Sequence, residues 1–313
     1  MHIPDGMLEA RTWIPAWLGS AGILGYAVKR VRERLSDARI VMMAVLAALI
    51  FALQMLNFPV AGGTSGHFAG GALAAIVLGL WPAMLSMAAV VTIQALFFGD
   101  GGVTTLGANL LTMAIIGPAV GWAINAALLK VSKARTMRLA AAAIAGWCAC
   151  VGGALAAGLM LWLSGRAPLA AALVAMGGWH AVIGIGEGVI TAGIIGYLLA
   201  VRPDLLSDEE TSGAASSRKV VIGLGVVAIA AAGLSFLASS RPDGLEYVYE
   251  HIGTAFDGTT LVRGLMPDYA LPGVGNDTLA GILAGVVGVI ITGALAYALL
   301  SGMRRKHDRP GSE

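Results

Sequence analysis

The stretch MRLAAAAIAGWCACVGGALAAGLMLWL, residues 137–163, decides the fold class of this chain. It contains a single charged residue, Arg138, and it exceeds the roughly 20 apolar residues that a helix needs to cross a bilayer. Because backbone polar groups in lipid must be satisfied internally, we expect such a stretch to form an α-helix. Comparable apolar stretches recur on both sides of it, at residues 12–28, 40–57, 108–129, 178–200, 220–238 and 279–301.

Residues 68–98 form one apolar stretch that is too long for a single span. Trp81 and Pro82 near its middle predict a tight turn, because proline lacks the N–H that a continuous helix would use there. We therefore expect two short helices joined as a hairpin. The sequence then predicts an all-α membrane protein with nine transmembrane helices.

The overall composition agrees with a membrane protein and excludes an ordinary soluble domain. The chain is 58% hydrophobic and 12% charged, with a mean hydropathy of +0.82, whereas average soluble domains carry roughly 25% charged residues. Its 44 glycines suit closely packed membrane helices, where small residues let backbones approach. We expect the lipid bilayer, and no nucleic acid, among its partners.

The distribution of lysine and arginine predicts the orientation. Nine spans place the two termini on opposite sides, and an external N-terminus puts 16 of the 20 basic residues in the cytoplasm. The four that remain outside are Arg11, Arg166, Arg241 and Arg263. Since cytoplasmic segments are enriched in lysine and arginine, we expect the N-terminus outside and the C-terminus inside.

The segment RPDLLSDEETSGAASSRK, residues 202–219, divides the chain into two modules. It is polar, acidic and rich in small residues, which is typical of a cytoplasmic linker. We expect a seven-helix bundle at residues 1–201 and a two-helix module at residues 220–313. The second module then carries a long external loop at residues 239–278.

The first residues, MHIPDG, have the chemistry of a metal-binding group. The acidic start of the chain is unlike a secretory signal peptide, and His2 is too large for removal of Met1, so we expect a free terminal amine. The amine, the His2 amide and the His2 imidazole can form fused chelate rings around one divalent ion. A fourth nitrogen would complete a square plane, a geometry that favours Ni(II) or Cu(II).

His67 is the candidate for the fourth nitrogen. It lies in AGGTSGHFAGG, residues 61–71, on the same predicted external face as the N-terminus. Glycines on both sides allow the backbone to approach a ligand closely, and PDG at residues 4–6 predicts a turn that folds the N-terminus back. The candidate metal ligands are therefore Met1, His2 and His67.

These motifs resemble a known family. MHIPDG, the GGTSGHFAGG loop and WHAVIGIGEGVITAGIIGYL, residues 179–198, are similar to the CbiM/NikM substrate-binding subunits of energy-coupling factor (ECF) transporters. This resemblance covers residues 1–201. SSRPDGLEYV, residues 239–248, and LMPDYALPGVGN, residues 265–276, are similar to the PDGLE-type NikN module that accompanies these subunits.

The resemblance implies a function and a set of partners. The chain would be the substrate-binding (S) component of an ECF-type ABC transporter in the bacterial cytoplasmic membrane. It would import Ni²⁺ or Co²⁺ as substrate, the latter ion connecting it with cobalamin biosynthesis. The family's ligands correspond to the terminal amine of Met1, the amide and ring nitrogens of His2, and His67. Its partners are a transmembrane coupling (T) subunit and a pair of ABC ATPases.

The sequence itself lacks the means to hydrolyse ATP. No G-x-x-x-x-G-K-[ST] phosphate-binding motif occurs in the chain, so we expect no ATP site on it. Nickel and cobalt both remain open as the substrate, although nitrogen ligation in a square plane favours nickel.

Two other functions remain open from the residues alone. A self-sufficient ion-coupled carrier usually needs several intramembrane carboxylates, whereas Glu187 is nearly alone. A metal-dependent intramembrane enzyme using His180 and Glu187, which share a helix face, needs three protein ligands and an open water position. No HExxH or comparable cluster occurs, so we expect no enzyme. We expect His180 and Glu187 to be structural or to orient a metal-binding histidine.

Four more polar residues have expected roles. Gln94 and Asn109 are expected to form hydrogen bonds at helix ends. Asp243 and Glu246 of the PDGLE motif are oxygen donors, which suit nickel poorly on their own. We expect these two acids to serve loop structure or metal entry.

Overall fold

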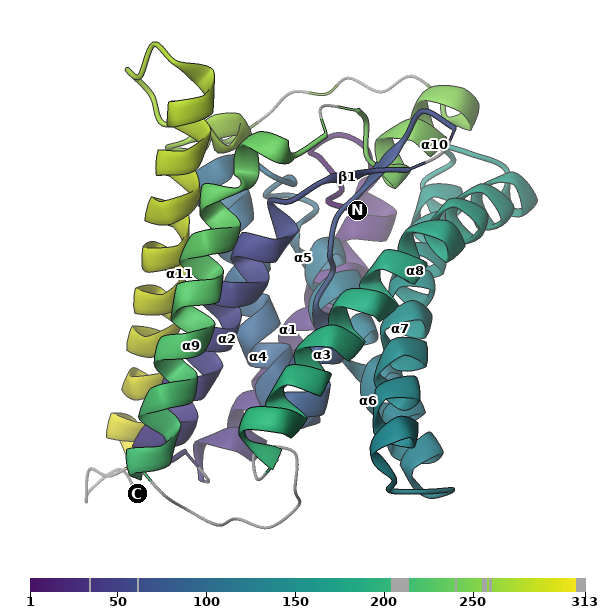
Figure 1. The fold of residues 1–313 in the computed structure, drawn as a ribbon. Coiled ribbons are helices and arrows are strands. Elements are labelled where there is room, and N and C mark those ends of the chain that lie inside the picture. The colour runs from purple at the N-terminus through teal and green to yellow at the C-terminus, as the bar shows by residue number, and fades with distance from the viewer. Residues whose placement is uncertain are drawn as a thin grey trace.

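The computed structural model describes residues 1–33, 35–60, 62–203, 214–239, 241–254, 258 and 261–307, without the side chains of 214–221 and 305–307. This part of the chain is mainly helical, and its long helices run between the two ends of the molecule (Figure 1). The α-helices are α1 (Ala10–Arg32), α2 (Asp37–Gln54), α3 (Gly71–Leu78), α4 (Leu80–Ile93), α5 (Leu106–Asn109), α6 (Gly117–Leu129), α7 (Arg135–Leu163), α8 (Leu169–Val201), α9 (Ala214–Gly233), α10 (Gly244–Ile252) and α11 (Asp277–His307). Short π-helical segments follow α4 at Gln94–Phe98 and α5 at Leu110–Ile116, and 3-10 turns lie at Ser235–Leu237 and Pro267–Tyr269.

Six helices of the described residues are long and apolar enough to cross a membrane. They cover Asp37–Gln54, Leu80–Phe98, Leu106–Leu129, Arg135–Leu163, Leu169–Val201 and Asp277–Arg304. Their outer faces carry apolar side chains, as Val174, Ile185 and Val189 on α8 illustrate with exposures between 61% and 76%. The prediction of an all-α, multi-pass membrane protein is confirmed, whereas the number of nine spans stays a prediction.

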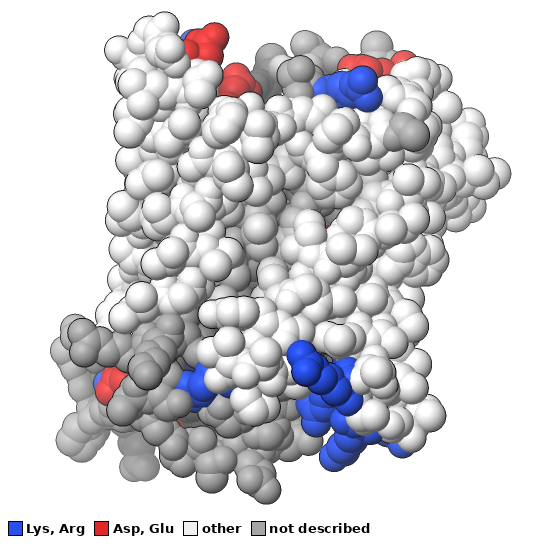
Figure 2. Space-filling view, in the orientation of Figure 1, with Lys and Arg blue, Asp and Glu red and all other residues white. Residues whose placement is uncertain are grey.

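Charged side chains gather at the two ends of the bundle. Figure 2 shows lysine and arginine mainly at the end that carries the C-terminus, and most of the visible acidic side chains at the opposite end. An almost uncharged belt separates the two ends. Such a belt is what the hydrocarbon core of a bilayer requires.

The apolar stretch of residues 68–98 contains two helices, as expected, but the break lies elsewhere. Gly79, at φ 81°, separates α3 from α4, and a φ of this sign favours glycine. Trp81 and Pro82 lie in the first turn of α4, where proline is tolerated because its missing N–H would have no helical partner. With eight residues, α3 is roughly 12 Å long and cannot cross a hydrocarbon core of about 30 Å by itself.

The segment between α2 and α3 enters the interior of the molecule. It contains a short antiparallel ladder of β1 (Phe58–Pro59) and β2 (Ser65–Gly66). Residues 64–70 are all buried. Gln54, at the end of α2, holds this segment by donating from Nε2 to the Ala69 carbonyl at 2.7 Å. The segment thereby carries His67 into the bundle.

The two long helices of the C-terminal module pack directly on the first module. α9 and α11 lie beside α2 (Figure 1). Phe51 of α2, Phe98 and Tyr269 form one aromatic cluster, with ring centroids 4.8 to 6.1 Å apart. One core is thus shared by both halves. Most of the linker predicted at 202–219 lies outside the described residues, so the module boundaries stay a prediction.

Candidate metal centre

The first residues of the chain are held inside the molecule by side chains from distant elements. Met1 is only 5% exposed. The Ile3 N–H donates to Asn109 Oδ1 at 2.8 Å, and Asn109 Nδ2 donates to the Ile3 carbonyl at 3.0 Å. The Thr105 hydroxyl donates to the same carbonyl. Because both backbone groups of Ile3 are bonded, the two residues before it are fixed in position.

The turn predicted for residues 4–6 is present and points the chain inward. Gly6 has φ 80°, which favours glycine. Asp5 Oδ1 accepts hydrogen bonds from the Thr104 N–H at 2.8 Å and from the Thr104 hydroxyl at 2.6 Å. The turn is therefore attached to the loop before α5.

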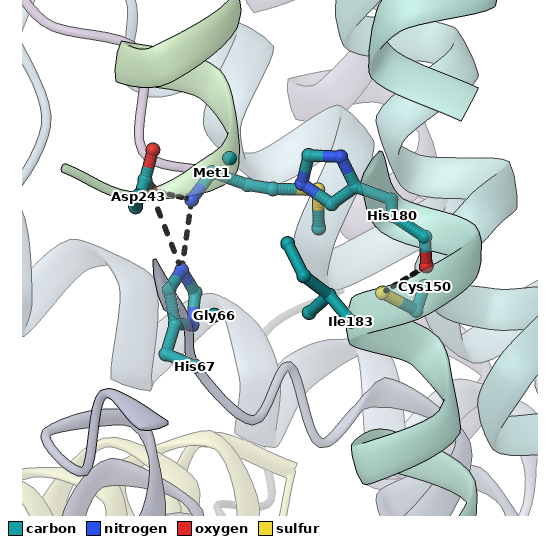
Figure 3. Close-up of a pocket in the computed structure, with 8 residues that line it drawn as sticks. Met1, Gly66, His67, Cys150, His180, Ile183 and Asp243 are labelled. Carbon is teal, nitrogen blue, oxygen red and sulfur yellow. Dashed lines mark hydrogen bonds and ion pairs between the residues drawn. The ribbon is translucent and has the colours of Figure 1, made fainter. Parts of the chain in front are cut away.

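His67 lies beside the terminal amine (Figure 3). Its Nε2 is 2.8 Å from the Met1 nitrogen, and its Nδ1 is 3.2 Å from the Phe68 carbonyl oxygen. In this arrangement Nδ1 carries the proton and Nε2 offers its lone pair. Burial, together with the charge of the N-terminus and the neighbouring His2, lowers the pKa of His67 below its usual range. The imidazole is therefore neutral near pH 7, which is the form that binds a metal.

The ring of His2 stacks on that of His67, with centroids 5.5 Å apart and planes inclined by 21°. Its Nδ1 lies 3.1 Å from Asp100 Oδ1, and its Nε2 lies 3.0 Å from Gln94 Oε1. The structure thus brings together Met1, His2 and His67, while their role as metal ligands stays a prediction. Because both ring nitrogens of His2 are engaged, coordination by either one requires its present contact to open.

The expectation that Gln94 and Asn109 serve helix ends is wrong. Their side chains bond to His2 and to Ile3, which lie 92 and 106 residues away in the chain. A buried amide needs hydrogen-bond partners, but sequence alone does not say which segment supplies them. Here the N-terminal segment does.

Asp100 is a site residue that sequence reasoning missed. The only signal for it was a polar residue among glycines in GDGG, residues 99–102. Burial opposes ionisation of Asp100, but His2 and the Tyr269 hydroxyl, which donates to Oδ2 at 2.6 Å, together hold its pKa below the usual range. Asp100 is therefore ionised and connects the His2 ring to the C-terminal module.

Asp243 of the PDGLE motif contacts the metal-binding candidates directly (Figure 3). Its Oδ2 accepts a hydrogen bond from the Met1 ammonium and lies 3.8 Å from His67 Nε2. Burial raises the pKa of this carboxyl, but the N-terminal charge and His67 outweigh burial and hold the pKa below its usual range. The carboxylate is therefore ionised, and it neutralises the buried ammonium.

Hydrogen bonds within the PDGLE motif fix the position of Asp243. Asp243 Oδ1 accepts from the N–H groups of Leu245 and Glu246 at 2.8 and 2.9 Å, and Glu246 Oε2 accepts from the Asp243 N–H at 3.0 Å. This reciprocal pair is a capping box at the start of α10. The sequence pattern D-x-x-E was thus a signal of helix capping, and it leaves the second oxygen of Asp243 free for Met1.

Residues 241–246, which contain the PDGLE motif (the PDGLE segment), also dock on residues 64–70, which carry His67 (the His67 loop). The Ser65 N–H donates to the Pro242 carbonyl at 2.9 Å, and the Ser65 hydroxyl donates to the Arg241 carbonyl at 2.8 Å. Gly244 packs so closely on α8 that a Cβ atom there would lie 2.8 Å from His180 Cε1 and 2.9 Å from Ile183 Cδ1. The expected role of Asp243 and Glu246 in loop structure is therefore confirmed, and their expected role in metal entry stays a prediction.

Replacement of Gly244 by alanine is expected to destabilise the protein by about 1–3 kcal/mol, because the added methyl group overlaps the His180 ring. Thermal unfolding of the purified protein in detergent measures this effect. Gly225→Ala is the matched control, since a Cβ atom at that helical position meets nothing within 4 Å. Equal melting temperatures for the two variants would contradict the close packing of the PDGLE segment on α8.

His180 and Glu187 lie near the site but make different contacts. His180 Nδ1 is 2.8 Å from the Met176 carbonyl oxygen, and its ring lines the same pocket as Met1, His67 and Asp243. Glu187 accepts hydrogen bonds from the loop that follows His67. Within the described ranges, no three His, Cys, Asp or Glu side chains are placed to share a metal. A metal bound at this place would therefore depend on nitrogens of the N-terminal backbone.

Comparison with known proteins gives two family matches. Residues 2–205 match CbiM, described as the cobalt uptake substrate-specific transmembrane region, and residues 218–305 match the PDGLE domain. The chain is 40% identical over 303 residues to a protein of Archaeoglobus fulgidus named as a fused nickel transport protein, NikMN, covering 96% of this chain and 98% of the relative. It is 30% identical over 351 residues to the fused nickel transport protein NikMN of Rhodobacter capsulatus, covering 99% of this chain and 100% of the relative.

A solved structure is also similar. A crystal structure of a truncated transition metal transporter matches with a TM-score of 0.59 and 34% identity, covering 64% of this chain and 99% of the other. These relatives are named for metal transport, which points to a transporter and away from an enzyme.

Proposed function

Because this chain belongs to the CbiM family of cobalt uptake transmembrane regions and carries a PDGLE domain in addition, we propose that it is the substrate-binding subunit of an ECF-type transporter for Ni²⁺ or Co²⁺. The observation that carries this proposal is the buried contact between the Met1 amine and His67 Nε2, at 2.8 Å. Both groups offer a nitrogen to a metal once the amine has lost a proton. Two such nitrogens facing each other are suited to one borderline metal ion.

Metal capture at this site would use four nitrogens. The amine of Met1, the amide and ring of His2, and His67 Nε2 form the set, and the ion is the transported substrate. The amine and the amide must lose protons to coordinate, so binding releases protons. It also requires the His2 ring to exchange its contact with Asp100 or Gln94 for the metal. Nitrogen ligation favours nickel over cobalt, in agreement with the names of the two fused relatives.

The proposed orientation places this site at the outer face of the membrane. Lysine and arginine gather at the end of the bundle that carries the C-terminus (Figure 2), which supports an external N-terminus and a cytoplasmic C-terminus. The proposed topology is a seven-helix module, residues 1–201, followed by a two-helix module, residues 220–313, with α3 as the short member of the first. Metal would then enter from outside, past the PDGLE segment.

The energy for import would come from other subunits, because the chain has no phosphate-binding motif of the P-loop type. We propose a transmembrane coupling subunit and a pair of ABC ATPases as partners.

Uptake of radioactive nickel at low external concentration tests this arrangement. Cells that express this chain with its coupling subunit and ATPases should accumulate nickel, and cells with catalytically inactive ATPases should not. The alternative, a self-sufficient ion-coupled carrier, predicts equal uptake in both, and that result would overturn the proposed ATPase dependence.

A further inference from the structure

One face of α8 contacts two of the segments that meet at the proposed metal site, the one that carries His67 and the one that carries Asp243. His180, Ile183 and Glu187 are three and four residues apart and so lie on the same side of the helix. His180 and Ile183 pack on Gly244 of the PDGLE segment, and a Cβ atom on Gly66 would lie 2.6 Å from Ile183 Cγ2. Glu187 is the polar member of this face. It is only 1% exposed, and a buried carboxyl group is stable only when it is hydrogen-bonded.

The partners of Glu187 are two backbone N–H groups of the His67 loop. Its Oε2 accepts from Ala69 N at 2.6 Å, and its Oε1 accepts from Gly70 N at 2.9 Å. Both groups lie at the N-terminal end of α3, where the helix dipole favours a carboxylate. Gly70 has φ 81°, a backbone shape that presents the two successive N–H groups to α8.

These bonds fix the backbone immediately after His67. The Ala69 peptide is held from both sides, because its carbonyl accepts from Gln54 while its N–H donates to Glu187. The ring of His67 is tied to the same stretch, since its Nδ1 bonds to the Phe68 carbonyl. The direction of His67 Nε2 toward the Met1 amine therefore depends on where Glu187 holds residues 69 and 70.

We infer that Glu187 is a positioning residue for metal binding, which acts through His67 and does not itself touch the ion. This inference rests on the proposed function, in which His67 is a ligand. Groups that orient a metal ligand typically change affinity about 10–100-fold when they are replaced.

Titration of the purified protein with Ni²⁺ tests the inference. Glu187→Gln keeps the size of the side chain but offers one acceptor oxygen for two N–H groups, so we expect Ni²⁺ affinity to fall at least about tenfold and the visible absorption of planar Ni(II) to weaken. Thr191→Val is the matched control. Thr191 is the next buried polar residue on this face of α8, and its hydroxyl has no hydrogen-bond partner in the described part of the chain, so its replacement should leave affinity unchanged.

A double-mutant cycle separates positioning from general structural damage. The cycle uses Cu²⁺, which binds nitrogen sites more tightly than Ni²⁺ and so stays measurable when His67 is removed. If Glu187 acts through His67, Glu187→Gln should change affinity less than about twofold in the His67→Ala background. A full loss in that background would overturn the inference, as would unchanged affinity of the single variant.

The same measurements distinguish failure of the inference from failure of the proposed function. Unchanged affinity of His67→Ala would reject the proposed site itself, whereas a weakened His67→Ala with an intact Glu187→Gln would reject only the role of Glu187. Thermal unfolding in detergent checks that each variant is folded. If the glutamine variant does not fold, Glu187→Asp replaces it in the cycle, because its shorter side chain cannot reach both N–H groups, and an unchanged affinity would again overturn the inference.

Discussion

A protein extended by Met-Gln-Gln before Met1 is expected to lose high-affinity Ni²⁺ binding, with an affinity at least about 100-fold lower, or about 2.8 kcal/mol. The extension turns the terminal amine into a peptide nitrogen and removes the charge that pairs with Asp243. Met1 is only 5% exposed in its pocket, so the added residues would also push it out of that pocket. The three added residues matter, because a single insertion after Met1 would create a third-position histidine that chelates nickel without His67.

Metal analysis of the purified protein, followed by titration calorimetry, measures this effect. The parent protein should carry any affinity tag at its C-terminus, so that Met1 stays free. The control is the same three residues added after Glu313, which should leave binding unchanged. An N-terminally extended protein that is folded and still holds nickel at parental affinity would refute the proposed role of the terminal amine.

His67→Ala is expected to leave the protein folded but unable to retain Ni²⁺ through purification. The imidazole supplies the one nitrogen of the set that is remote in sequence, 66 residues from Met1, and the remaining three nitrogens cannot close the square plane. Apart from its contacts with Met1, His2 and Asp243, the side chain makes one backbone hydrogen bond, to Phe68. Thermal unfolding in detergent checks that the variant is folded. Metal content and the visible absorption of planar Ni(II) measure the result.

His251→Ala is the matched control for this variant. His251 is exposed, and its Nδ1 lies 2.7 Å from the carbonyl oxygen of Tyr247 within α10. Its replacement should leave nickel binding as in the parent. Stoichiometric nickel on a folded His67→Ala protein would show that another residue supplies the fourth ligand.

Much of the molecule could be predicted from the sequence because the relevant physics is local. The stretch at 137–163 forms a membrane helix because apolar side chains and satisfied backbone groups are its only stable state in lipid. The turn at residues 4–6 follows from a glycine that adopts positive φ. The break in residues 68–98 is an exception. The sequence predicts it at Trp81-Pro82, but it lies at Gly79, because proline is harmless in a first helical turn.

In the candidate site, the sequence predicts the nitrogen ligands, and only the tertiary structure shows which groups hold them in place. Nitrogen chemistry and the turn-forming residues around them predict Met1, His2 and His67 as candidate ligands. The identity of the groups that hold them depended on the tertiary structure. Met1 pairs with Asp243, which is 242 residues away, and Glu187 bonds to the His67 loop from 118 residues away. A carboxylate in the sequence is equally able to cap a helix, face water or neutralise a buried amine, and only the packing of α8, α10 and the N-terminal segment selects among these.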